Sequence, residues 1–302
     1  MSKLCAMIAL VTLTALLAPG AMIAPARAAE DKLTPNDGAA GDFLGSAVAI
    51  SNTAVIGSIF GGSNSVYVFA RHGGTWAQEQ KLVASDGQAG DRFGVSVAVN
   101  GDTLVVGAPG DDGNRGSAYV FTRTNGIWTE QQKVTASDGL ALDGFDFAAA
   151  LSVDTFVVGA TSDDGGRGPA YVFVRDGAVW IEQQKLTAGD RAPGDVFGQG
   201  VAIRGMTILV GSPAADVGSN DAQGAAYVFD RRGSAWPEEA KLTASDGTAL
   251  DFFGFAVAIG PSGRFLIGAP GDEGNRGSAY VLRCSARGSE PRRNTSYHSR
   301  AE

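Results

Sequence analysis

Pairs of adjacent carboxylates are the residues of this sequence best suited to chemistry. Each pair lies in a glycine-rich loop that recurs along the chain; the pairs are Asp111-Asp112, Asp163-Asp164 and Asp272-Glu273. Adjacent carboxylates repel each other unless a cation offsets their charge, and carboxylate oxygens are ligands that Ca²⁺ prefers. An arginine stands three or four positions after each pair, at Arg115, Arg167 and Arg276. Two interpretations stay open: internal ion pairing with these arginines, or a weak calcium site on the surface.

A second group of aspartates stands just before a recurring Phe-Gly position: Asp42, Asp91, Asp143, Asp195 and Asp251. Companion aspartates occur five residues earlier, mostly in Ser-Asp-Gly turns: Asp37, Asp86, Asp138, Asp190 and Asp246. Aspartate in such turns commonly accepts hydrogen bonds from backbone N–H groups. We expect this turn chemistry, and the alternative is a ring of carboxylates that binds a cation.

Groups suited to catalysis are scarce. The chain has two histidines, His72 and His298, and a nucleophilic triad needs such a base beside a nucleophile. The carboxylate pairs recur by symmetry and do not form one distinctive acid/base pair. No glycine-rich loop enters a helix to bind phosphate. The sequence therefore predicts a protein that is not an enzyme and requires no cofactor.

The carboxylates recur because the chain consists of internal repeats. The repeats start near Lys32, Lys81, Lys133, Lys185 and Lys241, at spacings of 49, 52, 52 and 56 residues. In the second repeat, strand-like runs cover 93–99, 103–107, 117–123 and 128–135. Asn100-Gly101 is a strong signal for a two-residue hairpin, because both turn positions need positive φ. Four antiparallel strands repeated about every 50 residues are typical of a β-propeller blade, so the predicted fold class is all-β.

The motifs that flank these strands resemble the FG-GAP repeats of integrin α-subunits and of many secreted bacterial proteins. Phe93-Gly94 with Gly107-Ala108-Pro109 and Phe253-Gly254 with Gly268-Ala269-Pro270 carry the full signature. Phe197-Gly198 with Gly211-Ser212-Pro213 matches with one change, and the other two copies are looser: Leu44-Gly45 with Gly57-Ser58-Ile59, and Phe145-Asp146 with Gly159-Ala160-Thr161. The resemblance covers residues 31–283 and implies an integrin-like propeller. The Trp-Asp and paired-glycine signatures of WD40 and kelch repeats are missing.

The integrin calcium site does not carry over with the resemblance. Integrin-like repeats hold calcium in an Asp-x-Asp-x-Asp-Gly-type loop between the first two strands of a blade. Calcium needs six to eight oxygens from about a dozen residues of loop. Here the loop is reduced to two residues: Asn100-Gly101, Val153-Asp154 or Arg204-Gly205. We therefore expect no calcium site of the integrin type.

The ends of the repeat array indicate how a ring of five blades could close. Lys32-Leu33-Thr34 resembles an outer strand without a preceding blade, and the last repeat stops after its third strand, 278–282. Pairing of these segments would complete blade five and remove an exposed sheet edge. The alternative is an incomplete ring of seven blades, the number found in integrins.

One tryptophan recurs at an equivalent position of four repeats: Trp76, Trp128, Trp180 and Trp236. A sugar-binding platform is one interpretation, but recurrence at a fixed position favours packing between blades. The tyrosines lie in runs such as Ala-Tyr-Val-Phe, typical of strands buried on both faces: Tyr67, Tyr119, Tyr171, Tyr227 and Tyr280.

Residues 1–28 have the features of a signal peptide, with Lys3 before an apolar run and Ala26-Arg27-Ala28 before the cleavage site. The alternative, a membrane anchor, is disfavoured because Pro19, Gly20 and Pro25 keep the run below the roughly 20 apolar residues of a spanning helix. Removing this segment leaves Cys284 as the single cysteine, so no internal disulfide is expected. The propeller then covers residues 29–283, and residues 284–302 are expected to form a disordered basic tail.

Between these ends the chain carries a net charge of about −13, which disfavours nucleic acid as a partner. We expect an exported propeller (secreted, periplasmic or at the cell surface) without a membrane span after cleavage. It would bind or adhere to an extracellular protein or glycan. The alternatives are a secreted polysaccharide-active enzyme, and a structural spacer or fragment of a larger seven-bladed surface protein.

Overall fold

The computed structural model describes residues 30–58 and 64–283. The expected signal peptide (1–28) and the expected tail (284–302) lie outside these residues. The chain divides into two units, Met1–Lys32 and Leu33–Glu302, and all the strands belong to the second unit. Within the described part, no helix has the length and apolar character needed to cross a membrane.

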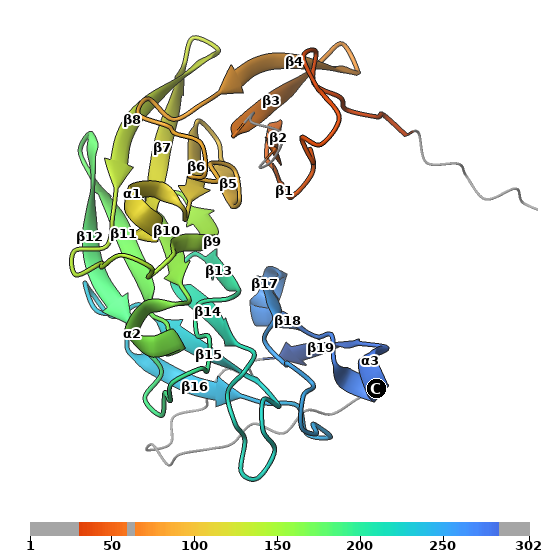
Figure 1. Cartoon of the computed structure of the whole chain (residues 1–302), viewed down its shortest axis with the longest axis vertical. Helices are drawn as coiled ribbons and strands as arrows, with labels where there is room; N and C mark the ends of the chain where they lie inside the picture. Colours follow the sequence, from red (N-terminus) through yellow and green to blue (C-terminus); the bar gives the residue numbers. More distant parts are fainter. Residues whose placement is uncertain (1–29, 59–63, 284–302) are drawn as a thin grey trace, which may run out of the picture. The chain divides into compact units, whose positions relative to one another are not determined.

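Each repeat forms one antiparallel sheet, or blade, whose strands neighbour one another in sequence order (Figure 1). Blade one contains β1 (Ala47–Ile50), β2 (Thr53–Ser58), β3 (Ser65–His72) and β4 (Thr75–Leu82). Blade two contains β5 (Val97–Asn100), β6 (Thr103–Ala108), β7 (Ser117–Thr124) and β8 (Ile127–Val134). Blade three contains β9 (Phe145–Ser152), β10 (Thr155–Ala160), β11 (Ala170–Asp176) and β12 (Val179–Leu186).

Blade four contains β13 (Val201–Arg204), β14 (Thr207–Ser212), β15 (Ala225–Asp230) and β16 (Glu238–Leu242). Blade five contains β17 (Ala256–Ile259), the 3-10 turn η1 (Pro261–Gly263), β18 (Arg264–Ala269) and β19 (Ser278–Arg283). Short helical turns follow the second strand in three blades: α1 (Asp111–Asn114), α2 (Asp163–Gly166) and α3 (Asp272–Asn275). The fold is an all-β propeller of five blades, as the repeats predict.

Strand composition follows the position of each strand in its blade. The second strand of blade two, β6, is buried along its whole length, because neighbouring blades cover both faces of the sheet. In the fourth strand, exposed and partly buried residues alternate, as in β4. That alternation is expected of an outer strand with one side toward a neighbour and the other toward solvent.

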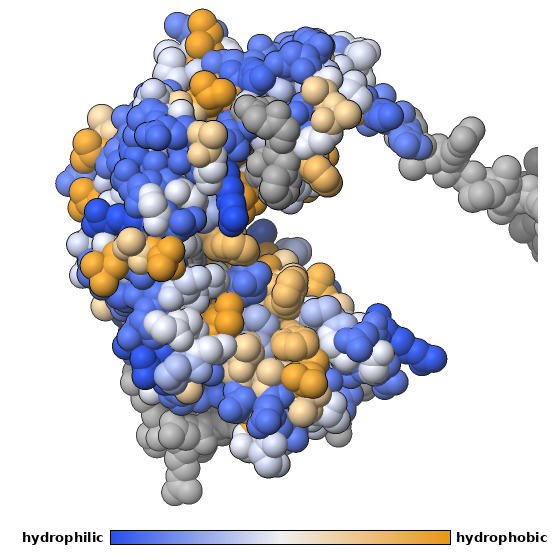
Figure 2. Space-filling model, in the orientation of Figure 1, coloured by the Kyte–Doolittle hydropathy of each residue, from blue (hydrophilic) through white to orange (hydrophobic). Residues whose placement is uncertain are grey.

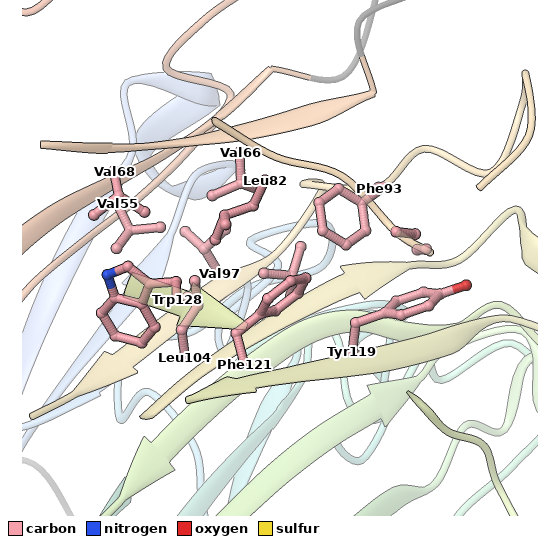
Figure 3. Packing of buried hydrophobic residues seen from close by; sticks show 13 residues of the cluster. Val55, Val66, Val68, Leu82, Phe93, Val97, Leu104, Tyr119, Phe121 and Trp128 are labelled. Atoms are coloured by element: carbon pink, nitrogen blue, oxygen red, sulfur yellow. The ribbon is translucent and has the colours of Figure 1, made fainter. Parts of the chain in front are cut away.

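Figure 3 shows how two consecutive blades pack. Valines and a leucine of blade one contact the aromatic and aliphatic side chains of blade two, and the two sets form one buried cluster. The ring centroid of Phe93, the phenylalanine of the Phe-Gly motif, lies 5.5 Å from that of Tyr119 and 6.0 Å from that of Phe121, edge-on to both. Full burial of such a side chain contributes about 1.5–3 kcal/mol, so the motif phenylalanine is a packing residue.

Equivalent clusters join blades two and three, three and four, and four and five. The tryptophans of three blades are buried in these junctions: Trp128, Trp180 and Trp236. This burial confirms their packing role, because a buried indole offers no face to a sugar.

The glycines of the motif are required by close contact between blades. A Cβ atom on Gly211, at the end of a second strand, would lie 1.8 Å from the carbonyl oxygen of Gly254 in the next blade. A Cβ atom on Gly57 would lie 2.1 Å from the carbonyl oxygen of Gly94. Any side chain at these points would push the blades apart, so the Gly of Phe-Gly and the Gly of Gly-Ala-Pro are two sides of one contact.

The hairpin between β5 and β6 lies one residue further on than predicted. Asn100 is still a strand residue and pairs with Thr103, so the turn is Gly101-Asp102. Gly101, not Asn100, has the positive φ, at 59°. Val153 takes the same place in blade three with a φ of 52°, a conformation that is unfavourable for a β-branched residue.

The predicted closure by Lys32-Leu33-Thr34 is not formed in this structure. Residues 32–34 lie in no strand, and within the described part β19 pairs only with β18. Leu33 packs instead against the buried Tyr67 and Phe69 of blade one. Within the described residues, blade five therefore has three strands.

Candidate functional site

The loops that carry the predicted carboxylates gather at one end of each blade. The segments that lead from a fourth strand to the next blade emerge there, together with the turns between second and third strands. We call this the loop end, and we call the opposite end, which has the two-residue turns, the hairpin end. The two kinds of loop contact each other, since the Gly110 N–H donates to the Asp91 carbonyl at 3.0 Å.

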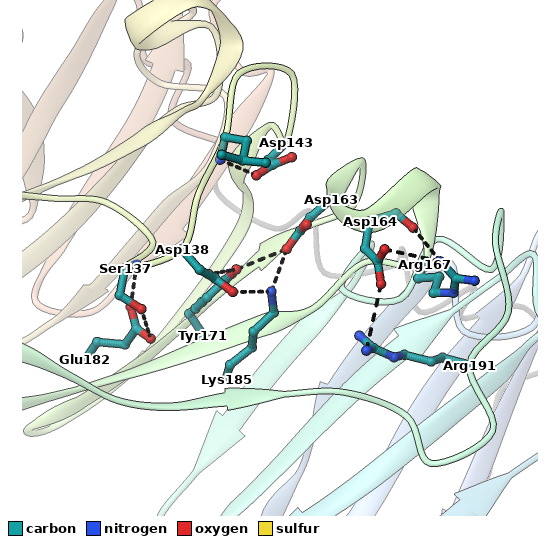
Figure 4. A network of polar contacts seen from close by, with 11 residues as sticks. Ser137, Asp138, Asp143, Asp163, Asp164, Arg167, Tyr171, Glu182, Lys185 and Arg191 are labelled. Atoms are coloured by element: carbon teal, nitrogen blue, oxygen red, sulfur yellow. Dashed lines mark hydrogen bonds and ion pairs between the residues drawn. The ribbon is translucent and has the colours of Figure 1, made fainter.

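In blade three, a lysine, a tyrosine and two aspartates form a network at the loop end (Figure 4). Lys185 Nζ lies 2.7 Å from Asp138 Oδ2 and 2.8 Å from Asp163 Oδ2. The Tyr171 hydroxyl donates to Asp138 Oδ1 at 2.7 Å and lies 3.1 Å from Asp163 Oδ2. Tyr171 and Lys185 meet because they are directly opposite each other in β11 and β12.

This network fixes the charge of its members. The hydrogen bond from Lys185 holds the pKa of Asp138 below its usual value. Burial alone would lower the pKa of Lys185, but its hydrogen bonds to the two aspartates outweigh burial and raise it. Burial raises the pKa of Tyr171, and the neighbouring carboxylates raise it further. Lys185 thus stays charged and Tyr171 stays protonated near pH 7, where neither is suited to proton transfer.

The same network recurs in the other blades with graded completeness. Blade two has all four residues, with Lys133 Nζ at 2.7 Å from Asp86 and 2.6 Å from Asp111. Blades one and four retain a lysine–aspartate pair, Lys81–Asp37 at 2.6 Å and Lys241–Asp190 at 2.7 Å. In blades one to four, the lysine at the end of the fourth strand therefore fastens the loops of the loop end to its blade.

Five of the six carboxylates proposed as calcium ligands have different side-chain partners. Asp111 and Asp163 belong to the lysine networks. Asp112 lies 3.8 Å from Lys133 Nζ, and Asp164 lies 3.2 Å from Arg167. In blade five, Asp272 accepts a hydrogen bond from the Tyr280 hydroxyl at 2.8 Å and another from the backbone N–H of Glu273.

The cations that pair with these carboxylates differ from those expected from the sequence. Of Arg115, Arg167 and Arg276, only Arg167 forms an ion pair within the described residues. In blades two and three, a lysine from the end of the fourth strand takes the expected place of the arginine beside Asp111 and Asp163. Over residues 30–58 and 64–283, no group of three or more Asp, Glu, His or Cys is arranged to hold a metal ion. Weak calcium binding at these turns stays a prediction.

The aspartates before the Phe-Gly position are turn residues, as expected. Asp42 accepts the backbone N–H of Ala39 at 2.7 Å, and Asp195 accepts that of Ala192 at 2.6 Å. Burial raises the pKa of Asp195. The companion set behaves differently in blades one to four, because Asp37, Asp86, Asp138 and Asp190 bind lysine and tyrosine side chains.

Sequence reasoning missed a set of exposed apolar side chains at the loop end: Phe43, Leu140, Leu142 and Leu250. Leu142 and Leu250 occupy positions where the other loops have glycine, Gly41, Gly90 and Gly194. All five positions have positive φ, 78° and 68° for the two leucines. The replacement of Ala-Gly-Asp or Pro-Gly-Asp by Ala-Leu-Asp in the sequence was the signal that could have found them.

Comparison with known families agrees with this geometry. The FG-GAP repeat family model matches residues 28–69, 76–121, 128–173, 180–229 and 236–282, well over half of the chain. The chain belongs to the FG-GAP repeat family. Each match after the first begins in or just before the fourth strand of one blade and ends within the third strand of the next blade. One FG-GAP repeat therefore spans the junction between two blades. No curated protein matches the chain.

FG-GAP propellers are generally scaffolds without catalysis, and they often take part in binding. Within the described part of this FG-GAP protein, the one histidine, His72, is exposed on the surface and lies 3.2 Å from Glu79. The tyrosine hydroxyls of blades two to five and the lysines of blades one to four are engaged with the aspartates of the loop end.

Proposed function

We propose that this protein is an exported, non-enzymatic FG-GAP propeller that binds an extracellular protein or glycan through its loop end. The observation that carries the proposal is the placement of exposed leucines, Leu142 and Leu250, at positive φ. A non-glycine residue in this conformation costs roughly 1–2 kcal/mol. Glycine at the same position in three other loops avoids that cost. Strain at an exposed apolar residue supports a role in contact with another molecule.

The loop end is also preorganised for binding. The Asp143 carboxylate accepts the backbone N–H of Leu140 at 2.5 Å, which ties the loop that carries Leu140 and Leu142. The Lys185 network fastens the same loop to blade three through Asp138. A loop that is already ordered loses little conformational entropy when a ligand binds.

The surface chemistry of the loop end limits the class of ligand that it can bind. Half-exposed carboxylates, such as Asp86 and Asp138, also lie at this end. Figure 2 shows apolar residues interspersed with hydrophilic ones over the visible face, rather than one continuous apolar patch. Such a mixture suits a polar protein surface or a glycan, and the negative charge disfavours phosphate-rich nucleic acid.

The test is an array of extracellular matrix proteins and glycans, probed with the mature protein. Leu142→Gly and Leu250→Gly each restore the residue of the other loops, so they should preserve or raise stability while binding falls. Val153→Gly is the matched control, because it makes the same kind of change at the hairpin end. Equal binding by all three variants would contradict the loop-end assignment.

Export is tested separately by intact mass of the protein recovered outside the cytoplasm. We expect the mature chain to begin at Ala29. A full-length chain embedded in the membrane would contradict export with cleavage.

A further inference from the structure

Blade five presents an unpaired edge and an uncovered face. Within the described part, β19 pairs only with β18, whereas the third strand of every other blade has a fourth strand beside it. Val281 in β19 is 60% exposed, while the equivalent Val228 of blade four is 2% exposed and packs against blade five. Leu266 in β18 is also exposed. An open strand edge beside an apolar face is a template for pairing with another chain segment.

Blade one presents the complementary face. Val48 and Ile50 of β1 are 69% and 71% exposed. Their equivalents in blade two, Val97 and Val99, pack into the junction with blade one. In blades one to four, the face equivalent to the exposed face of blade five packs against the next blade. In blades two to five, the face equivalent to the exposed face of blade one packs against the previous blade. Because these side chains are all exposed, the two faces do not cover each other within one chain.

Residues 33–37 already lie on blade one as residues 82–86 lie on blade two. Leu33 packs against the buried aromatic residues of blade one, and Leu82 packs against those of blade two. The Asn36 N–H donates to Gln78 Oε1 at 2.8 Å, which matches the contact of Ser85 with the next blade. In the later repeats, the residues that make these contacts lie at or just after the end of the fourth strand of the preceding blade. The 33–37 segment and the blade-one face therefore form one docking surface that lacks its neighbouring blade.

The polar groups of blade five lack the same component. The Tyr280 hydroxyl lies 3.2 Å from Asp246 and 2.8 Å from Asp272, as in the networks of blades two and three. No lysine of the described residues forms an ion pair with either aspartate, although a lysine does so in each of the other four blades. Two carboxylates around one hydroxyl favour an incoming strand that carries an ammonium group. In the sequence, a lysine directly precedes Leu33, as Lys81 directly precedes Leu82.

We propose that blade five binds the blade-one face of a second copy of this chain, with the residues around Leu33 of that copy as its fourth strand. A second copy supplies all the missing parts: the apolar face, the Leu33 segment and a lysine at the matching position. The interface repeats the four blade junctions already present in the chain. Two copies related by a twofold axis make the contact twice and leave no open edge.

Disulfide trapping tests the register of this contact. In the complete blades, the residue equivalent to Ala279 is directly opposite the last residue of the fourth strand, as Ala226 is opposite Leu242. Leu33→Cys with Ala279→Cys therefore places two thiols within disulfide reach across the interface. The variants are made in the full chain with Cys5→Ser and Cys284→Ser, and light and isotopically heavy proteins are mixed before oxidation.

We expect disulfide-linked dimers that contain light–heavy peptide pairs. Leu33→Cys with Val153→Cys, at the hairpin end, should give no such link. A link within single chains would overturn the proposal in favour of ring closure.

Sedimentation of the protein without added cysteines gives a second, independent test. We expect twice the molar mass of one chain, and loss of this dimer in Val281→Asp without a change in circular dichroism. Val179→Asp in β12 is the control, because Val179 is an exposed strand valine away from both faces, and it should leave the dimer intact. A wild-type monomer, or a Val281→Asp dimer, would refute the proposal even where the cysteine variants fold poorly.

Discussion

Lys133 in blade two holds two carboxylates, and its replacement measures what the loop-end networks contribute to stability. Its ammonium lies 2.6 Å from Asp111 Oδ2 and 2.7 Å from Asp86 Oδ2. Asp111 is only 5% exposed, so it depends on this cation and on the Ser117 and Tyr119 hydroxyls. Lys133→Met removes the charge and keeps an apolar stem of similar length over the Tyr119 ring.

The magnitude follows from the burial of the two partners. Leaving a fully buried charge without its partner costs about 3–5 kcal/mol. Lys133 is about a quarter exposed, so water compensates part of the loss. We therefore expect Lys133→Met to lower the free energy of unfolding by about 2 kcal/mol, which corresponds to a Tm lower by about 4–8 °C in a domain of this size.

Urea denaturation and calorimetry measure this effect, and blade one provides the control. Lys81 has the same place as Lys133, but its aspartate partner, Asp37, lies on the surface. Lys81→Met should therefore change stability much less. Adding Asp111→Asn to Lys133→Met should recover most of the loss, because a neutral amide needs no cation. Equal losses in the two lysine variants, or no recovery in the double variant, would refute the reasoning.

Three further predictions concern strain, acid and metal. Val153→Gly should raise the free energy of unfolding by about 0.5–1 kcal/mol, since relief of the positive-φ strain exceeds the extra chain entropy of glycine; a lower Tm would contradict it. Lysine hydrogen bonds depress the pKa values of Asp86 and Asp138, so their stabilisation is present above pH about 4 and is lost as pH falls further; Tm measured from pH 7 to 3 should fall mainly below pH 4. Excess chelator should hardly change Tm, and a drop of more than about 10 °C would show structural calcium.

Much of the fold could be predicted from the sequence because each repeat provides an independent copy of the same signal. In blade two, the expected runs 103–107, 117–123 and 128–135 agree with β6, β7 and β8 to within a residue or so. The first run was expected from Phe93, but β5 starts at Val97. The reason is local: Arg92 and Gly94 have φ values of 59° and 100°, so the motif forms a turn before the strand.

Blade three lacks the motif glycine, and its first strand starts earlier. There Asp146 stands in place of the motif glycine, and β9 extends back to Phe145. A run of apolar residues does not distinguish a packed turn from a strand. The residue type at the second motif position distinguishes them. Glycine there adopts positive φ and forms a turn, whereas the aspartate of blade three lies in extended backbone.

The cation of the candidate site could not be predicted from neighbours in sequence, because it comes from a hairpin partner. Arg115 stands beside Asp111 in the chain, yet the partner is Lys133, 22 residues later. The pairing of β7 with β8 places Tyr119 opposite Lys133, and the loop before β5 brings Asp86 to the same point. The tyrosine and the lysine recur in the sequence at a constant separation. With the register of the hairpin between the third and fourth strands, that separation places the two residues opposite each other. The same register identifies what blade five lacks: its tyrosine and both aspartates are present, so the residue that completes them must enter on a strand paired with β19.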